Sequence, residues 1–280
     1  MNLPFNTDLK GQVAVITGGG GILCSDFSKA LAKCGAAIAV LDINEEAAKK
    51  VAEDIQAQGG KAIHVKTDCL DVESLKAARA VVAEKLGACT ILINGAGGNN
   101  PRGTTDDEEY NAQAQGIKTF FDLDASGIRF VFDLNVTAAF LTTQVFAKDM
   151  AEAGKGNIIN ISSMSAFAPL TKVAAYSGAK AAVSNLTQWL AVYFAKSGIR
   201  VNALAPGFFV TNQNRDLLFD KEGKPTARTE KILRSTPMNR FGEARELIGT
   251  LLWLLNEEAA GFVTGVIVPI DGGFAAFSGV

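Results

Sequence analysis

Short apolar segments rich in β-branched residues alternate with longer amphipathic segments along most of the chain. The apolar segments span residues 12–17, 36–42, 61–68, 90–97, 157–163, 200–207 and 265–273. Residues 44–58 and 72–86 instead repeat apolar positions at helical spacing and carry charges on the opposite face. Strands that are apolar on both faces and separated by helices are typical of parallel sheets. The pattern therefore predicts an α/β fold, a doubly wound parallel sheet of about seven strands with helices on both faces.

Two long segments interrupt this alternation. Residues 98–128 follow the fourth predicted strand and are rich in turn-forming residues, and residues 208–242 follow the sixth. Excursions at the carboxyl ends of parallel strands commonly bind ligands, although a solvated surface loop remains the alternative for 103–116. No repeat or linker divides the chain, so residues 1–280 are expected to form one domain with both excursions on its substrate side.

Composition and charge narrow the classes of partner. The 280 residues are 48% hydrophobic, the net charge is −2, and no lysine- or arginine-rich block offers a face for phosphates. We therefore expect no nucleic-acid partner. The N-terminus has no signal-like pattern and no apolar run reaches ~18 residues, which predicts a cytoplasmic protein without a membrane partner.

Cysteine and histidine usage argues against a metal site. The four cysteines, Cys24, Cys34, Cys69 and Cys89, form no CxxC pair, and the single histidine, His64, lies in a predicted strand. One histidine excludes His-based zinc motifs, and structural thiols are the preferred interpretation of the cysteines.

The stretch "TGGGGILC" (17–24) joins the first strand to a predicted helix that ends at Gly35. Gly19, Gly21 and Cys24 fit the dinucleotide pattern G-x-G-x-x-G with only the last position changed. Early glycines let the backbone approach a pyrophosphate at the helix N-terminus, and the last serves helix–strand packing. Cysteine is a small apolar residue, so the change is compatible with a Rossmann-type nucleotide site.

Asp42 ends the second predicted strand, close to the spacing of the acidic residue that binds an adenosine ribose. A carboxylate there accepts hydrogen bonds from both ribose hydroxyls and repels a 2′-phosphate, and its neighbours Ile43 and Asn44 include no arginine. The carboxylate and the lack of a neighbouring arginine together favour NAD over NADP. The alternative role for Asp42, a helix N-cap, is one that Asn44 is placed to fill.

The segment "YSGAK" puts Tyr176 and Lys180 four residues apart on one helix face. A nearby ammonium favours the phenolate and so brings a tyrosine toward useful acid–base range. Periodicity alone also allows a plain core stripe, made of Tyr176, Ala179, Val183, Leu186, Leu190 and Tyr193.

With these pieces the chain resembles the classical short-chain dehydrogenase/reductase family over nearly its full length. The matches follow the family order: the glycine turn, "NGAG" (94–97), "FDLNV" around Asn135, "NISS" (160–163), "YSGAK" (176–180) and "PGFFVT" (206–211). The resemblance implies an NAD-binding catalytic domain that moves hydride between nicotinamide and a secondary alcohol/ketone pair.

The resemblance also implies residue roles. Tyr176 would be the general acid–base, Lys180 would lower its pKa and hold the nicotinamide ribose, and Asn135 would support a proton-relaying water. Ser163, thirteen residues before Tyr176, would hydrogen-bond the substrate oxygen. The remaining implied cofactor contacts are Gly18, Gly19, Gly21, Ile22, Leu23, Asp42, Asp68, Cys69, Asn94, Ala96, Gly97, Pro206, Gly207, Phe209 and Thr211.

The opening motif departs from the family spelling TGxxxGxG, which would put glycines where this chain has Ile22 and Cys24. That spelling, the insertion after "NGAGGNNP", "KTFFDLD" and the terminus "DGGFAAFSGV" resemble one branch, the D-mannonate oxidoreductases (fructuronate reductases). The expected substrate is a sugar acid, D-mannonate or D-fructuronate. Candidate substrate residues are Asn99, Asn100, Arg102, Ser163, Gln213 and Arg215, with Lys118, Lys172, Asn212 and Asn214 as further polar candidates.

Three alternatives stay open: another polyol, gluconate or 3-oxoacyl reductase, a catalytically silent NAD(H)-binding regulator, and a sugar-acid-binding protein without redox chemistry. The complete set of Ser163, Tyr176 and Lys180 argues against the last two. The resemblance further implies a homotetramer built on helices 130–152 and 176–196.

Overall fold

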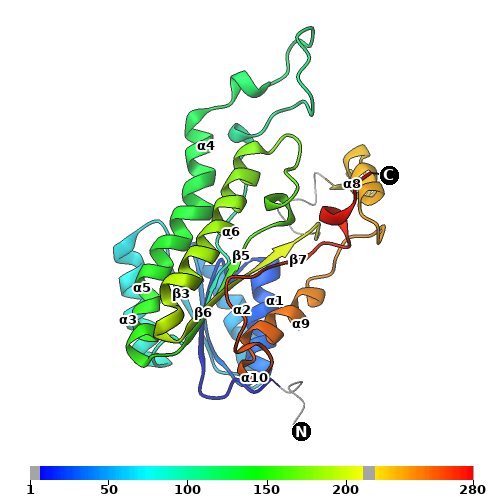
Figure 1. The fold of residues 1–280 in the computed structure, drawn as a ribbon. Helices are drawn as coiled ribbons and strands as arrows, with labels where there is room; N and C mark the ends of the chain where they lie inside the picture. The colour runs from blue at the N-terminus through cyan, green and yellow to red at the C-terminus, as the bar shows by residue number, and fades with distance from the viewer. Residues whose placement is uncertain (1–6, 211–217, 280) are drawn as a thin grey trace.

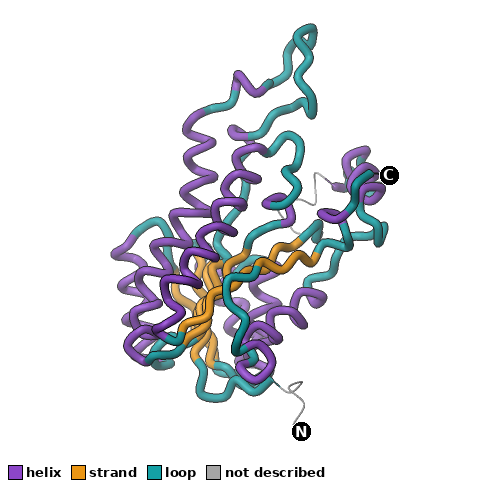
Figure 2. The backbone as a smooth tube through the Cα atoms, in the orientation of Figure 1, coloured by secondary structure: helices purple, strands orange, loops and turns teal. Residues whose placement is uncertain are grey.

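The computed structural model describes residues 7–210 and 218–279, and its centre is one parallel sheet (Figures 1 and 2). The strand order is β3-β2-β1-β4-β5-β6-β7, and every neighbouring pair is parallel. The strands are β1 Val13–Thr17, β2 Ala37–Asp42, β3 Ala62–Lys66, β4 Ile91–Asn94, β5 Gly156–Ile161, β6 Ile199–Pro206 and β7 Ile267–Ile270. Five of the seven fall inside the segments predicted from the sequence, and β5 and β6 each begin one residue earlier, so the predicted fold class is confirmed.

Helices cover both faces of the sheet (Figure 1). One layer contains α1 Ile22–Lys33, α2 Glu45–Ala57 and α9 Arg245–Leu255, followed by the short α10 Glu257–Ala260. The other contains α3 Val72–Lys85, α5 Ala138–Ala153 and α6 Ala174–Phe194. Along β1, Ala14 and Ile16 pack in the first layer while Val13 and Val15 pack in the second. This two-sided burial explains why the strands read as continuous apolar runs.

The helix caps follow the sequence chemistry. The Asn44 side chain accepts a hydrogen bond from the Ala47 N–H, so Asn44 caps α2 as predicted, and Asp71 caps α3 in the same way. His64 lies within β3, as its predicted strand placement requires.

The strand order reverses direction on either side of β1, because β1 pairs with β2 on one side and with β4 on the other. Thr17 and Asn94, the last residues of β1 and β4, are register partners. The connections leaving these two strands diverge to opposite faces and leave a crevice at their carboxyl ends, where α/β proteins bind ligands. The glycine turn and the "NGAG" turn therefore meet at one edge of the sheet.

The helical stretch Ala125–Ala153 joins α4 (Ala125–Phe132) to α5 through a π-helical turn, η3 (Asp133–Thr137). Within the described residues, this stretch is the one helix long and apolar enough to cross a membrane, judged by length and composition alone. A core helix passes the same test, and 44% of its most apolar window is buried inside the protein.

The first excursion projects beyond the N-terminal end of α4, at the top of Figure 1. It contains two short 3₁₀ helices, η1 (Pro101–Gly103) and η2 (Phe120–Asp122). The described part of the second excursion contains α8 (Ala227–Ser235). Lys231 on α8 pairs with Glu108 at 2.8 Å, so an ion pair joins the two excursions.

Candidate active site

Tyr176 and Lys180 project from the first turns of α6 toward the carboxyl end of β5. The Lys180 Nζ donates to the Ile161 carbonyl at 2.8 Å and lies 5.7 Å from the centre of the Tyr176 ring. Ser163 follows β5 directly and caps the 3₁₀ turn η4 (Met164–Ala166), its Oγ accepting from the Ser165 N–H at 3.2 Å. The fold thus brings the three predicted catalytic side chains to one edge of the sheet.

Burial controls the proton affinities of this group. It lowers the pKa of Lys180 to about 8, because a buried ammonium loses hydration. Burial also raises the pKa of Tyr176, an effect that a hydrogen bond with Ser163 partly offsets. The lowered tyrosine pKa expected from the Tyr176–Lys180 spacing is therefore not found in this arrangement, because desolvation of the phenolate outweighs the hydrogen bond with Ser163.

The core-stripe alternative describes the inner face of α6 only in part. Ala179, Val183, Leu186 and Leu190 are buried as that interpretation requires, but the Tyr193 side is open to solvent, with 64% of the residue exposed. Tyr193 stacks on Trp189 with ring centres 4.9 Å apart. The predicted place of Tyr193 in the buried stripe is therefore wrong, because in the last turn of α6 this position lies on the exposed face of the helix.

Asn135 lies buried in the π-helical turn η3, a kind of distortion that is frequent at functional sites. Its side chain accepts from the Gly98 N–H at 3.2 Å and donates to the Gly98 and Val131 carbonyls, both at 2.7 Å. A Cβ at Gly97 would lie 2.7 Å from Asn135 Oδ1 and 3.1 Å from Lys180 Nζ. Asn135 therefore holds the segment after β4 against the catalytic lysine, and only glycine fits at position 97.

The glycine turn forms a tight cradle between β1 and α1. Gly18 has φ +62°, and a Cβ there would lie 2.9 Å from the Gly95 carbonyl oxygen. A Cβ at Gly19 would lie 2.6 Å from Val40 Cγ1. Positions 18 to 21 therefore carry no side chain in front of Ile22, the first residue of α1, so a pyrophosphate can approach the N–H groups in the first turn of this helix. The residues present fit a dinucleotide.

Asp42 leaves the end of β2 and turns back onto this cradle. Its Oδ2 accepts from the Gly20 N–H at 3.0 Å and its Oδ1 from the Asn44 N–H at 2.9 Å. The carboxylate is therefore fixed beside the turn, where its remaining lone pairs can accept from ribose hydroxyls. Ile22 and Leu23 begin α1 next to it.

The other predicted cofactor residues differ in exposure. Asn94 is buried, and its Nδ2 donates to Thr143 Oγ1 at 3.0 Å and to Asn160 Oδ1 at 2.8 Å, so this side chain ties β4 to β5 and α5. Cys69 is buried, which raises its pKa to about 11, while Asp68 is exposed and caps the following turn through Leu70 N–H. Ala96 is half-buried beside Gly97 at the edge of the crevice.

The segment after β6 packs closely on the C-terminal part of the chain. Pro206 ends β6, and a Cβ at Gly207 would lie 2.5 Å from Asp271 Cα. Phe209 is buried, with its ring against Gly242. Thr211, Asn212, Gln213, Asn214 and Arg215 lie outside the described residues.

The predicted substrate residues in and beside the first excursion bond mainly to other groups of that excursion. Asn100 caps η1 by accepting from the Arg102 N–H at 2.9 Å, and the Asn99 amide donates to Thr104 Oγ1 at 2.9 Å. The Lys118 ammonium donates to the Pro101 carbonyl, and Lys172 Nζ donates to the Asp106 carbonyl at 2.8 Å. Arg102 differs, because its side chain is 60% exposed and its ion pair with Asp124 is long, at 3.7 Å. Arg102 is the most available cation among these candidates.

Two parts of the site were not predicted from the sequence. The 3₁₀ turn η6 (Phe274–Ala276) contacts η4 next to Ser163, and the rings of Phe208 and Phe274 meet edge to face at 5.3 Å. Asp271 holds this segment by accepting from the Gly273 and Ala275 N–H groups at 2.9 and 2.8 Å. The consecutive glycines after Asp271, both with positive φ, were the available signal for a tight turn.

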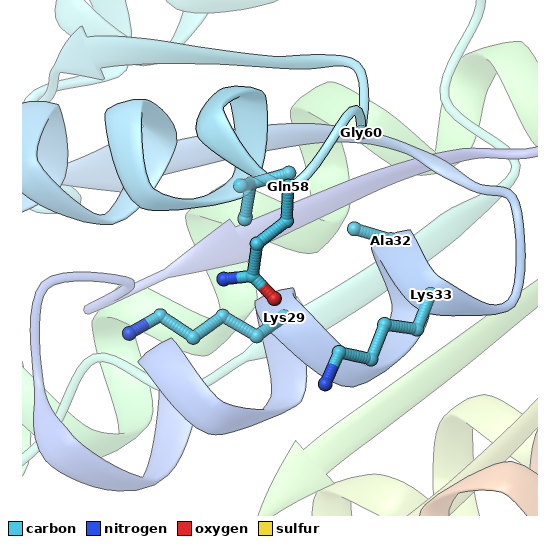
Figure 3. A pocket seen from close by; sticks show the side chains of 6 residues that line it. Lys29, Ala32, Lys33, Gln58 and Gly60 are labelled. Atoms are coloured by element: carbon cyan, nitrogen blue, oxygen red, sulfur yellow. The ribbon is translucent and has the colours of Figure 1, made fainter.

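A separate hollow lies between α1 and α2 near their C-terminal ends (Figure 3). It is open to solvent, and Lys29, Lys33 and Gln58 point into it. Lys29 is paired with Asp54 at 2.9 Å. Because α1 runs away from the glycine turn, this hollow is distant from the catalytic group.

A profile of short chain dehydrogenases matches residues 12–222 of this chain. The chain belongs to the short-chain dehydrogenase family. Its reaction class is accordingly that of a nicotinamide-dependent dehydrogenase/reductase, and the predicted enzyme class is confirmed.

Individual relatives are similar over essentially the whole chain. An uncharacterized oxidoreductase of Haemophilus influenzae is 58% identical over 100% of this chain and 99% of its own length. A crystal structure of a provisionally assigned D-mannonate oxidoreductase from Haemophilus influenzae with bound NAD is 58% identical, with a TM-score of 0.94 and 100% of both chains covered. A gluconate 5-dehydrogenase from Burkholderia cenocepacia, in complex with NADP and tartrate, is 30% identical, with a TM-score of 0.84 and 98% of both chains covered.

Proposed function

We propose that this enzyme interconverts D-mannonate and D-fructuronate with NAD. The observation that carries the proposal is the arrangement of Ser163, Tyr176 and Lys180 beside the glycine cradle. The similarity to an NAD-bound protein provisionally assigned to this reaction supports the choice of substrate. The direct test is a spectrophotometric screen of NAD and NADP reduction with a panel of aldonates and polyols.

The proposed roles follow from proton affinity and position. Ser163 donates a hydrogen bond to the substrate oxygen, and Tyr176 exchanges a proton with that oxygen. Lys180 is largely protonated near neutral pH with a pKa of about 8, so its charge favours the phenolate as the proton leaves Tyr176. Asn135 holds Gly98 and keeps the edge of the site fixed.

Glycines 18, 19 and 21 with the start of α1 would hold the pyrophosphate of NAD, and Asp42 the adenosine ribose. Asn94, Ala96 and Gly97, together with Pro206 to Phe209, would line the rest of the cofactor. When bound, NAD supplies the nicotinamide carbon that accepts the hydride.

Asp42 should make the enzyme prefer NAD, with kcat/KM for NAD exceeding that for NADP by roughly tenfold or more, because its carboxylate repels a 2′-phosphate. Asp42→Asn keeps an acceptor for the Gly20 N–H but removes the charge, so it should reduce the difference in kcat/KM mainly by raising kcat/KM for NADP. Asp42→Ala should reduce the same difference mainly by lowering kcat/KM for NAD. Steady-state kinetics with both cofactors measure this, and a wild-type preference for NADP would contradict the proposal.

The proposed substrate carries a terminal carboxylate, which a cation with hydrogen-bonding neighbours recognises. We expect D-mannonate to be oxidised efficiently and the uncharged D-mannitol to be oxidised poorly. Arg102→Ala should raise KM for mannonate by roughly tenfold or more while KM for NAD changes little, because an Arg–carboxylate contact is lost.

The control variant Lys33→Ala, in the distant hollow, should leave both constants unchanged. Equal efficiency on mannitol and mannonate would favour the polyol-dehydrogenase alternative. Efficient turnover of gluconate alone would favour the gluconate alternative, in line with the similarity to a gluconate 5-dehydrogenase.

We further infer a homotetramer from an uncharged helix face on one side of the sheet and a pair of exposed aromatic residues on the other. The exposed face of α6 carries no charged residue, although exposed helix faces are normally polar; its members are Ala174, Gly178, Ala181, Asn185, Gln188, Trp189, Val192 and Tyr193. On the other side, Trp253 and the fully exposed Phe262 lie near the edge strand β7. Two self-complementary surfaces would give a tetramer with two kinds of two-fold axis, which sedimentation can test.

A further inference from the structure

Cys24 lies at the point where the glycine turn meets the turn after β4. It is buried in the first turn of α1. A Cβ built on Gly95 would lie 2.2 Å from Cys24 Sγ and 2.7 Å from the Thr17 carbonyl oxygen. The sulfur therefore occupies the space in which a side chain at position 95 would stand.

The two turns also meet through backbone atoms. The Gly95 and Ala96 N–H groups both donate to Thr17 Oγ1, at 3.1 and 3.2 Å. Gly18 packs against the Gly95 carbonyl with no room for a side chain. Because Gly97 lies two residues further along, against Asn135 and Lys180, any shift of this turn is transmitted to the catalytic edge.

We propose that Cys24 is a positioning residue, which sets the spacing between the phosphate-binding turn and the turn after β4 by filling the space over Gly95. Position 24 and position 95 are then coupled by volume: a sulfur at 24 requires glycine at 95. This explains how the chain keeps a dinucleotide site without glycine at 24. The inference concerns nicotinamide binding and does not depend on which sugar acid the enzyme uses.

The thiol acts through its volume and not through its chemistry. Burial raises the pKa of Cys24 to about 12, with a smaller contribution from the Asp42 charge, so the sulfur stays protonated at neutral pH. An alanine at position 24 keeps the helix and removes only the sulfur. The contact can therefore be released without changing the charge of the site.

A double-mutant cycle tests the coupling, with the Kd for NADH measured by its fluorescence and the Tm measured in parallel. Gly95→Ala alone should raise the Kd at least ~10-fold, because the new methyl group collides with the sulfur. In the Cys24→Ala background the same substitution should raise the Kd by a factor at least ~3 times smaller, because the sulfur is gone and the Thr17 carbonyl oxygen, 2.7 Å from the new Cβ, is the one close contact left. Cys24→Ala by itself should stay within ~3-fold of the wild type.

Gly19→Ala is the matched control, because its Cβ would collide with Val40 and not with Cys24. Its effect on the Kd should be the same in both backgrounds. Equal effects of Gly95→Ala with and without the sulfur would overturn the proposal, as would relief of both glycine variants by Cys24→Ala.

If Gly95→Ala does not fold in either background, enlarging position 24 gives the second test. Cys24→Leu should press on Gly95 from the other side and raise the Kd at least ~10-fold in protein that remains folded. A Cys24→Leu variant that binds NADH as tightly as the wild type would overturn the proposal. These outcomes leave the proposed sugar-acid substrate untouched, because none of them uses it.

Discussion

Tyr176→Phe should lower turnover at least ~100-fold while the protein still folds and binds NAD. The substitution removes the hydroxyl that exchanges a proton with the substrate oxygen and keeps the ring that packs against Val131 and Ala179. Steady-state kinetics, circular dichroism and NADH fluorescence measure the three parts of this expectation.

Tyr193→Phe is the matched control on the same helix. Its hydroxyl lies on the exposed face next to Trp189, so turnover should stay at the wild-type level. Near-normal turnover of Tyr176→Phe would return Tyr176 to a packing role.

Lys180→Met should abolish most activity, at least ~100-fold, and at the same time raise the Tm at neutral pH. Lys180 is 5% exposed, and burial lowers its pKa from 10.5 to about 8. Below pH 8 the folded protein therefore holds a buried ammonium at a cost of about 3 kcal/mol. Methionine removes that cost and loses one hydrogen bond to Ile161, worth about 1 kcal/mol, so the Tm should rise by roughly 2–5 °C.

The Tm difference between Lys180→Met and the wild type should depend on pH. Between pH 8 and 10.5 the unfolded chain binds the lysine proton and the folded chain releases it, so wild-type stability gains from rising pH in that window. The Tm difference between Lys180→Met and the wild type should be largest at about pH 7 and should shrink toward about pH 10. Lys196→Met, on the exposed 3₁₀ turn η5 (Ala195–Ser197), should change neither quantity. A variant less stable than the wild type at both pH values would contradict the desolvation argument.

The positions of the strands along the chain could be predicted because the central strands are buried on both faces. Segments 12–17 and 157–163 overlap the observed β1 and β5, with differences of one or two residues at their ends. The helix that carries Tyr176 was also expected, although it begins at Ala174 and its last turn exposes Tyr193. The sequence shows whether a whole element is buried. Whether one side chain of that element is buried or exposed depends on the neighbouring elements in the fold.

The site was predictable only where a motif is local. Tyr176 and Lys180 lie four residues apart, so helix geometry alone brings them together. The contact between Cys24 and Gly95 joins residues that are distant in the sequence, and no periodicity reveals it. The opposite holds for two lysines at the first excursion: Lys118 and Lys172 look like free cations in the sequence, but each donates to a backbone carbonyl of that excursion, at Pro101 and Asp106.

The C-terminal turn has a consequence for the order in which the enzyme is made. The turns after β1 and β4, which meet at the nucleotide crevice, are both synthesised before residue 98, but Phe274 and its neighbours reach η4 only after β7 has paired with β6. A nascent chain can therefore pair strands β1 to β5 before the wall beside Ser163 closes. The nucleotide crevice takes shape early in synthesis, and the wall beside Ser163 is added only once β7 has been made.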